Sequence, residues 1–143
     1  MPMKSRVTVR AWVGALLALT TIESAHAASF DGTWSVLQVC ETTSDGARGY
    51  TWRYDADVKN SRFVGQYRNK GQVPSSMTLE GQIQVDGTAT LKASGISGDA
   101  EHNLKFAQAQ TPISFQVSAK FEGSKGSGTR LGSRACKFTF SKP

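Results

Sequence analysis

Side chains suited to catalysis or metal binding are few in this chain. It contains two histidines, His26 and His102, and two cysteines, Cys40 and Cys136. A zinc or copper site needs several such ligands, and a catalytic triad needs a histidine beside its nucleophile. His102 lies in the polar stretch 98–102, and no serine has the Gly-x-Ser-x-Gly context of a nucleophile elbow. We therefore expect no catalytic residue, no metal site, no cofactor and no enzymatic activity.

Two further patterns are compatible with chemistry but have simpler interpretations. Asp55 and Asp57 could form a carboxylate pair for glycoside hydrolysis, yet outward-facing acids on a strand are typical of a solvated surface. The glycine-rich run 123–130 resembles a phosphate-binding loop, but it lacks the Walker spacing and no predicted helix follows it. We predict a flexible β-turn for this run.

Aromatic residues are the remaining candidates, and they are concentrated in the first part of the domain. Core packing is the default interpretation, and a ligand pocket is the alternative. In the second case the ligand-binding residues would be Trp34, Tyr50, Trp52, Tyr54, Tyr67 and Arg134. Small residues at inward positions, such as Gly65 and Gly81, leave either room for a ligand or space that larger neighbours fill.

The elements that would position these residues are β-strands. Apolar and polar residues alternate with a period of two in 50–58, 77–85 and 113–121, which predicts strands with one buried face. Asp86-Gly87 predicts a hairpin between 77–85 and 89–93. Further strands are expected at 33–41, 63–67 and 136–140, and a weaker one at 104–106. No window favours a helix longer than a turn or two.

These strands predict an all-β fold, an eight-stranded antiparallel meander barrel, with a two-sheet β-sandwich as the alternative. Closing the sheet would remove its exposed edges and make the first and last strands neighbours. Cys40 and Cys136 would then meet and form a disulfide across the seam. Closing a loop of about 100 residues is worth up to roughly 4.7 kcal/mol in the chain-entropy model.

Residues 1–27 have the pattern of a secretory signal peptide. Lys4, Arg6 and Arg10 precede an apolar run at 11–22, and Ala25 and Ala27 suit cleavage after Ala27. A membrane anchor is the alternative, but this run covers only about 18 Å as a helix, against about 30 Å of bilayer core. We expect a periplasmic or extracellular protein whose single domain spans 28–143. Cleavage removes three basic residues and one acid, which lowers the net charge from +6 to +4.

Several residues carry a resemblance to known proteins. The pattern Phe30-Asp31-Gly32-Thr33-Trp34, Cys40, and Arg134-Ala135-Cys136 is similar to a group of small exported proteins common in alphaproteobacteria such as the rhizobia, which implies no particular activity. Gly32-Thr33-Trp34 also resembles the Gly-x-Trp of the calycins, which implies a barrel in which a late basic residue, here Arg134 or Arg130, packs over the tryptophan.

We therefore expect a monomeric, non-enzymatic binding protein whose partner is a small or apolar molecule or an envelope protein. Ligand binding predicts a cavity of a few hundred Å³. The alternative is an inhibitor or accessory protein of an envelope protease or lysozyme, acting through the mature N-terminus or the connection 69–75. The basic residues are scattered, so we expect no nucleic-acid partner. No transmembrane segment is expected after cleavage.

Overall fold

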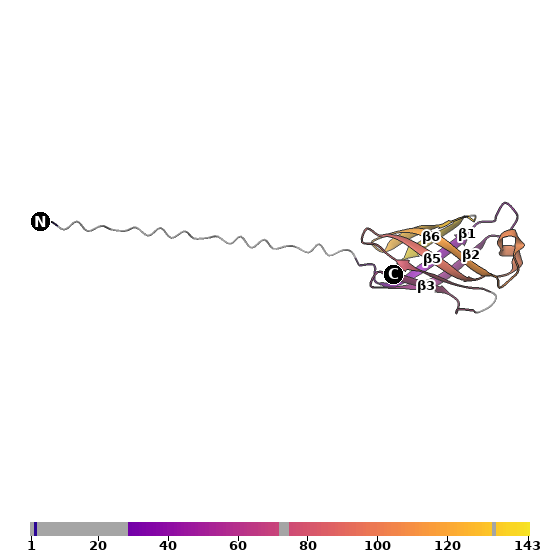
Figure 1. Cartoon of the computed structure of the whole chain (residues 1–143), viewed down its shortest axis with the longest axis horizontal. Coiled ribbons are helices and arrows are strands. Elements are labelled where there is room, and N and C mark those ends of the chain that lie inside the picture. The colour runs from indigo at the N-terminus through magenta and orange to yellow at the C-terminus, as the bar shows by residue number, and fades with distance from the viewer. Residues whose placement is uncertain (1, 3–28, 72–74, 133) are drawn as a thin grey trace.

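The computed structural model describes residue 2 and residues 29–71, 75–132 and 134–143. Apart from Pro2, the predicted signal peptide lies outside the described residues. The chain forms a closed barrel of eight antiparallel strands, in which each strand pairs with the next and β8 returns to β1 (Figure 1). The strands are β1 (Gly32–Cys40), β2 (Tyr50–Lys59), β3 (Arg62–Tyr67), β4 (Ser76–Gln82), β5 (Thr88–Ile96), β6 (Pro112–Glu122), β7 (Lys125–Leu131) and β8 (Cys136–Ser141). The predicted meander barrel is confirmed.

One of the eight strands was not predicted, and one predicted strand is not a strand. The weak strand expected at 104–106 is wrong, because Leu104–Phe106 form a short 3₁₀ helix, η2, which follows η1 (Ala100–His102). The flexible turn expected over 123–130 is also wrong, because the turn is confined to Gly123 and Ser124 and the rest belongs to β7. The predicted number of strands is therefore right, and the error is one strand placed at 104–106 in place of β7.

Glycine explains why β7 was missed in the sequence. Its inward positions Gly126 and Gly128 replace the apolar residues that reveal the other strands. A Cβ on Gly126 would approach the Phe121 side chain to 2.9 Å, and one on Gly128 would approach Val117 to 3.0 Å. The barrel interior beside β7 is therefore filled by its neighbours, which a larger residue on β7 would displace.

The hairpin predicted at Asp86-Gly87 is present, but its turn begins earlier. Gly87 donates its N–H to the carbonyl of Gln84, so Val85 and Asp86 occupy the centre of the turn. Val85, expected to face inward, is 82% exposed as a result. Gly87 has a φ of 86°, and a Cβ there would lie 2.1 Å from the carbonyl oxygen of Phe121, so only glycine fits.

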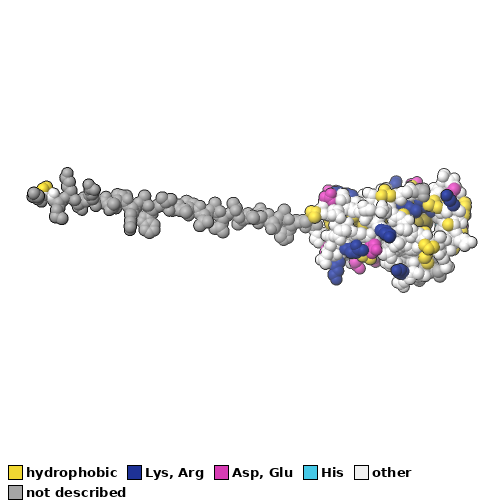
Figure 2. All heavy atoms as spheres, viewed as in Figure 1, with side chains coloured by type: hydrophobic (Ala, Val, Ile, Leu, Met, Phe, Trp, Pro, Cys, Tyr) yellow, Lys and Arg dark blue, Asp and Glu magenta, His cyan; other side chains and the backbone are white. Residues whose placement is uncertain are grey.

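The seam between β1 and β8 places Cys40 opposite Cys136, and the two form the predicted disulfide. Among the described residues, no helix is long and apolar enough to cross a membrane. Lys and Arg side chains are dispersed over the face seen in Figure 2, where acidic side chains lie among them.

The two ends of the barrel are connected differently (Figure 1). At the end that we call the closed end, the strands are joined by the short segments 60–61, 83–87 and 123–124. At the other, the open end, the connections are 41–49, 68–75, 97–111 and 132–135. The side chains at each end of the barrel are covered by the residues of the connections there. The difference in connection length therefore affects where space remains inside the barrel.

Aromatic packing fills the closed end. The Phe121 ring contacts those of Trp34, Phe63 and Phe140, with centroids 5.4, 5.8 and 4.8 Å away. The buried ring of Phe30 lies 6.0 Å from Phe121, and the indole N–H of Trp34 donates to the Phe30 carbonyl at 2.8 Å. The Phe30 ring is therefore part of the core.

Candidate functional site

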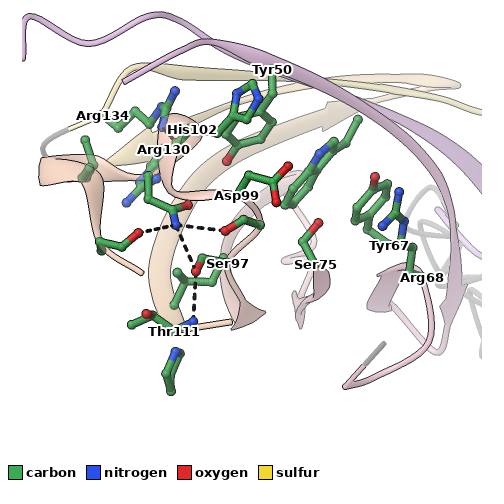
Figure 3. Close-up of a pocket in the computed structure, with 17 residues that line it drawn as sticks. Tyr50, Tyr67, Arg68, Ser75, Ser97, Asp99, His102, Thr111, Arg130 and Arg134 are labelled. Carbon is green, nitrogen blue, oxygen red and sulfur yellow. Dashed lines mark hydrogen bonds between the residues drawn. The ribbon is translucent and has the colours of Figure 1, made fainter. Parts of the chain in front are cut away.

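A cavity of about 320 Å³ lies at the open end of the barrel (Figure 3). It is lined from the strands by Tyr50, Trp52, Tyr67, Pro112, Ile113 and Arg130, and from the connections by Arg68, Ser75, Ser97, Gly98, Asp99, His102, Asn103, Leu104, Ala107, Thr111 and Arg134. Figure 3 shows Arg130 and Arg134 on one side of this space and Tyr67 and Arg68 on the other.

Three rings form one side of the cavity, which we call the aromatic wall: Tyr50 and Trp52 on β2, and Tyr67 at the end of β3. Tyr50 and Trp52 lie 4.6 Å apart between centroids, and Trp52 stacks on Tyr67 at 4.2 Å with the planes only 8° apart. The backbone pairs of β2 with β3 run from Ala56–Gly65 to Lys59–Arg62, well below these rings. The rings thus join the two strands where their backbones are no longer paired.

Arg134 holds the connections of the open end together. Its side chain is 2% exposed, and it donates to the carbonyls of His102, Glu41 (3.1 Å) and Arg48 (2.6 Å). Its guanidinium lies 4.9 Å from the Tyr50 ring centroid. Because both terminal nitrogens are used in backbone hydrogen bonds, Arg134 positions the cavity wall and has little capacity left for a ligand.

Arg130 is the opposite case. It projects inward from β7, and its guanidinium lies 4.0 Å from the centroid of the Phe115 ring. Within the described part of the chain Arg130 makes no hydrogen bond or ion pair. Its Nε is shielded from solvent without a partner, as is the Nε of Arg134, so the contrast lies in the unused terminal nitrogens of Arg130. Burial lowers the pKa of Arg130, the nearby Tyr50 phenol opposes that shift, and the positive charge of Arg134 adds to it.

The segment 97–111 forms the wall facing the aromatic rings, and Asn103 fixes its shape. The Asn103 amide donates to the carbonyls of Gly98 (3.0 Å) and Ala107 (2.7 Å) and to the hydroxyl of Ser97 (3.3 Å), as Figure 3 shows. The N–H of Thr111 donates to the same Ser97 hydroxyl at 3.0 Å. This network lets a segment with little regular structure act as a defined wall.

Charge around the cavity is mostly positive. Its lining contains Arg68, Arg130 and Arg134 against one carboxylate, Asp99. Arg68 and Asp99 are exposed at the rim, where solvent screens them, and Arg68 lies over Tyr67 at 5.2 Å. The ring nitrogens of His102 lie 3.3 Å from the Arg48 carbonyl and 3.3 Å from the Glu101 carboxylate. Inside the cavity, the charge therefore comes from the buried Arg134 and the half-buried Arg130.

Of the predicted ligand-binding residues, the structure brings Tyr50, Trp52, Tyr67 and Arg134 together in the cavity lining. Trp34 lies instead in the core of the closed end, fully buried. Tyr54 lies below the cavity, where its hydroxyl donates to the buried Gln38 side chain at 3.2 Å. Burial raises the pKa of both Tyr54 and Tyr50, and in Tyr50 the charges of Arg134 and Arg130 oppose the rise.

The expectation that Arg134 or Arg130 packs over Trp34 is wrong, because both arginines lie at the open end, against Tyr50 and Phe115. The inward glycines leave no extra room. A Cβ at Gly65 would approach Tyr54 to 3.1 Å, and one at Gly81 would approach Leu91 to 2.9 Å. In the connection 69–75, considered as an inhibitory loop, residues 72–74 lie outside the described residues.

Sequence reasoning missed Arg68, the whole 97–111 wall, and the position of Arg130 in a cavity. One available signal was the distance along the chain between the strong strand patterns ending at 93 and beginning at 113, which exceeds what a hairpin needs. Arg130 gave no signal, because the glycines of β7 conceal the strand that carries it.

Within the described residues, no group of three or more His, Cys, Asp or Glu side chains could hold a metal ion. The arrangement instead offers stacking surfaces, cations and fixed hydroxyl groups around one small space. No protein-family model, curated protein or solved structure matches this chain, so its resemblance to exported alphaproteobacterial proteins and to the calycins stays a prediction.

Proposed function

We propose that this protein is an exported, non-enzymatic binding protein that holds one small molecule in the open end of its barrel. The observation that carries the proposal is the cavity of about 320 Å³ between the aromatic wall and the segment 97–111. Ligand sites of about 300–1,000 Å³ with aromatic linings and a few polar groups are typical of small-molecule binding. An occupant would be a single compact molecule, because this volume is at the small end of that range.

The lining supports binding better than catalysis. Its imidazole, His102, is already in contact with a backbone carbonyl and with Glu101. The hydroxyl of Ser97 accepts from Asn103 and from the Thr111 N–H, so it is held as a structural group. Neither side chain is arranged as the base or nucleophile of a reaction.

Export is part of the proposal. A disulfide that joins the first and last strands supports an oxidising compartment, which for this chain would be the periplasm or the exterior. The disulfide also serves the binding site, because it joins β1 to β8 at the open end, where the cavity lies.

The proposal is tested with a variant that fills the cavity. Ala107 lines it, so Ala107→Trp places an indole in the space, whereas Ala109→Trp adds the same group to the same segment outside the lining. Ligand-observed NMR with a library of small aromatic, aliphatic and sugar fragments should find binders to the wild type and to Ala109→Trp that Ala107→Trp does not bind.

Native mass spectrometry of material purified from the cell envelope gives an independent measurement, and a co-purifying mass below about 300 Da would identify the natural occupant, given the size of the cavity. The proposal fails if no fragment distinguishes the two tryptophan variants while both remain folded by circular dichroism.

A further inference from the structure

We infer that the occupant of this cavity is a small aromatic or conjugated carboxylate, whose acid group binds Arg130 and whose planar body lies against the aromatic wall. This inference rests on the proposed function and assigns its ligand class. It follows from three observations: the unpartnered guanidinium, the sign of the charge around it, and the continuous ring surface beside it.

The first observation is the difference between the two inward arginines. Arg134 directs three hydrogen bonds to backbone carbonyls, so its role in the structure accounts for its presence. Arg130 makes none in the described part of the chain. The Nε of each arginine is buried without a partner, so the two differ in their terminal nitrogens, which are used in Arg134 and unused in Arg130. A guanidinium that lines a cavity and makes no hydrogen bond or ion pair within the described residues has its terminal donors available to a ligand, and charged donors bind acceptors strongly.

The second observation concerns charge. Arg130 and Arg134 are close enough that the charge of Arg134 lowers the pKa of Arg130, and no carboxylate is paired with either in the described residues. Asp99, the acid of the lining, is exposed at the rim. A bound anion would reduce this repulsion, and a carboxylate can accept from the two terminal nitrogens of one guanidinium together.

The third observation concerns shape. Tyr50, Trp52 and Tyr67 form an unbroken surface of rings spaced 4.6 and 4.2 Å apart, and the apolar side chains of Leu104 and Ile113 also line the space. Aromatic rings favour offset-stacked or edge contacts with other planar groups. The three rings and the Arg130 guanidinium line the same cavity, so the ring surface and the cation belong to one site.

The test uses pairs of ligands that differ only in charge. Benzoate and cinnamate are compared with benzamide and cinnamamide by isothermal titration calorimetry on the disulfide-bonded protein. We expect each carboxylate to bind wild type about tenfold or more tightly than its amide, because hydrogen bonds to charged groups contribute more than neutral ones.

Two variants separate Arg130 from the general positive charge of the protein. Arg130→Met keeps a long apolar side chain against Phe115 and removes the guanidinium, and it should abolish the preference for the carboxylates. Lys125→Gln removes one charge from the other end of the same strand and should leave the preference unchanged. Arg130→Lys, which keeps the charge but loses the planar donor edge, should retain part of it.

The inference is overturned if the acids bind no better than the amides, if Arg130→Met binds both as wild type does, or if no member of the panel binds. It is separable from the proposed function. Fragments of another class that bind wild type but not Ala107→Trp would overturn the assigned ligand and leave the binding function intact. Failure of every fragment in that comparison would overturn both.

Discussion

The closed and open ends of the barrel use the same strands and similar side chains, yet one is solid and the other hollow. Both contain several aromatic rings: Trp34, Phe63, Phe121 and Phe140 at one end, and the aromatic wall at the other. At the closed end, short turns and the glycines of β7 let the rings fill the axis. At the open end, the longer connections 41–49 and 97–111 are held together by Arg134, the disulfide joins β1 to β8, and a cavity remains beside the rings. Whether an inward ring is core or binding surface therefore depends on the connections above it.

The largest effect should come from emptying the closed end. Phe121→Ala removes a ring in contact with four others and should lower the free energy of unfolding by about 3–5 kcal/mol. Trp52→Ala at the open end should cost less than half as much, because Trp52 is half-exposed at a cavity and its removal leaves no closed void. Urea denaturation measures both, and an equal or greater loss for Trp52→Ala would contradict the comparison.

The disulfide should have the next largest effect. Replacing Cys40 and Cys136 together by alanine should lower the free energy of unfolding by about 2–5 kcal/mol. Because the disulfide lies at the open end, hydrogen exchange in the variant should quicken most in 41–49 and 132–135 and least around Phe121.

The double cysteine replacement combined with Phe121→Ala should have an additive effect on the free energy of unfolding, since the two sites lie at opposite ends of the barrel. Strong coupling between the two changes would mean that the ends are not independent.

The contrast also explains what the sequence could predict. Alternation of apolar residues in β2, β4 and β6 is caused directly by a one-sided core, so it identified these strands, the meander and the cysteine pairing. It failed at β7, where glycines make room for Phe121, and at Leu104–Phe106, where two apolar residues two apart belong to a 3₁₀ turn with positive φ at Lys105 and Phe106. Alternating apolar residues reveal a strand only where those residues are themselves buried. At β7 the side chains of neighbouring strands fill the interior instead, and at Leu104–Phe106 no residue is buried.

The candidate site was only partly predictable for a related reason. Tyr50, Trp52 and Tyr67 belong to strands with clear patterns, and so they were recognised together with Arg134. The same pattern also selected Trp34, because inward aromatic residues look alike in sequence whichever end of the barrel they occupy. The facing wall depends on side-chain hydrogen bonds within an irregular segment, chiefly those of Asn103, and no periodic signal accompanies them.

Acid should weaken both ends by a smaller amount and through one mechanism. Asp31 accepts the N–H groups of Ser61 and Asn60 at the closed end, and these bonds lower its pKa. At the open end, hydrogen bonds from the Thr43 hydroxyl and then the Lys105 N–H lower the pKa of Asp45. Because each folded-state pKa lies below the unfolded value, the stabilisation is present above about pH 4 and is lost as the pH falls through the folded-state pKa.

Two amide variants locate this effect. Asp31→Asn should lower the melting temperature at pH 7 and quicken exchange at 60–61, whereas Asp45→Asn should quicken exchange at 97–111. Each difference from wild type should shrink at acidic pH. Asp55→Asn on the outer face of β2 is the control. A constant difference from pH 7 down to acid would show that these carboxylates do not act through their ionised forms.

The smallest effect on stability should come from replacing Arg130. The sign of the change in the free energy of unfolding tests most directly whether the open end differs from the closed end. A residue selected for packing lowers stability when it is removed, whereas a partly buried cation without a counter-charge can be replaced by an apolar group at little loss or with a gain. Arg130→Met gives up the contact with Phe115 and also relieves repulsion from Arg134. We expect its free energy of unfolding to stay within about 1 kcal/mol of wild type, an ordinary size for a change away from the core. Cinnamate should raise the melting temperature of wild type and not of the variant, since a ligand stabilises only the protein that binds it. If Arg130→Met instead lowered the free energy of unfolding as much as Phe121→Ala, Arg130 would be a packing residue. The open end would then be an imperfectly packed part of the core and not a binding site.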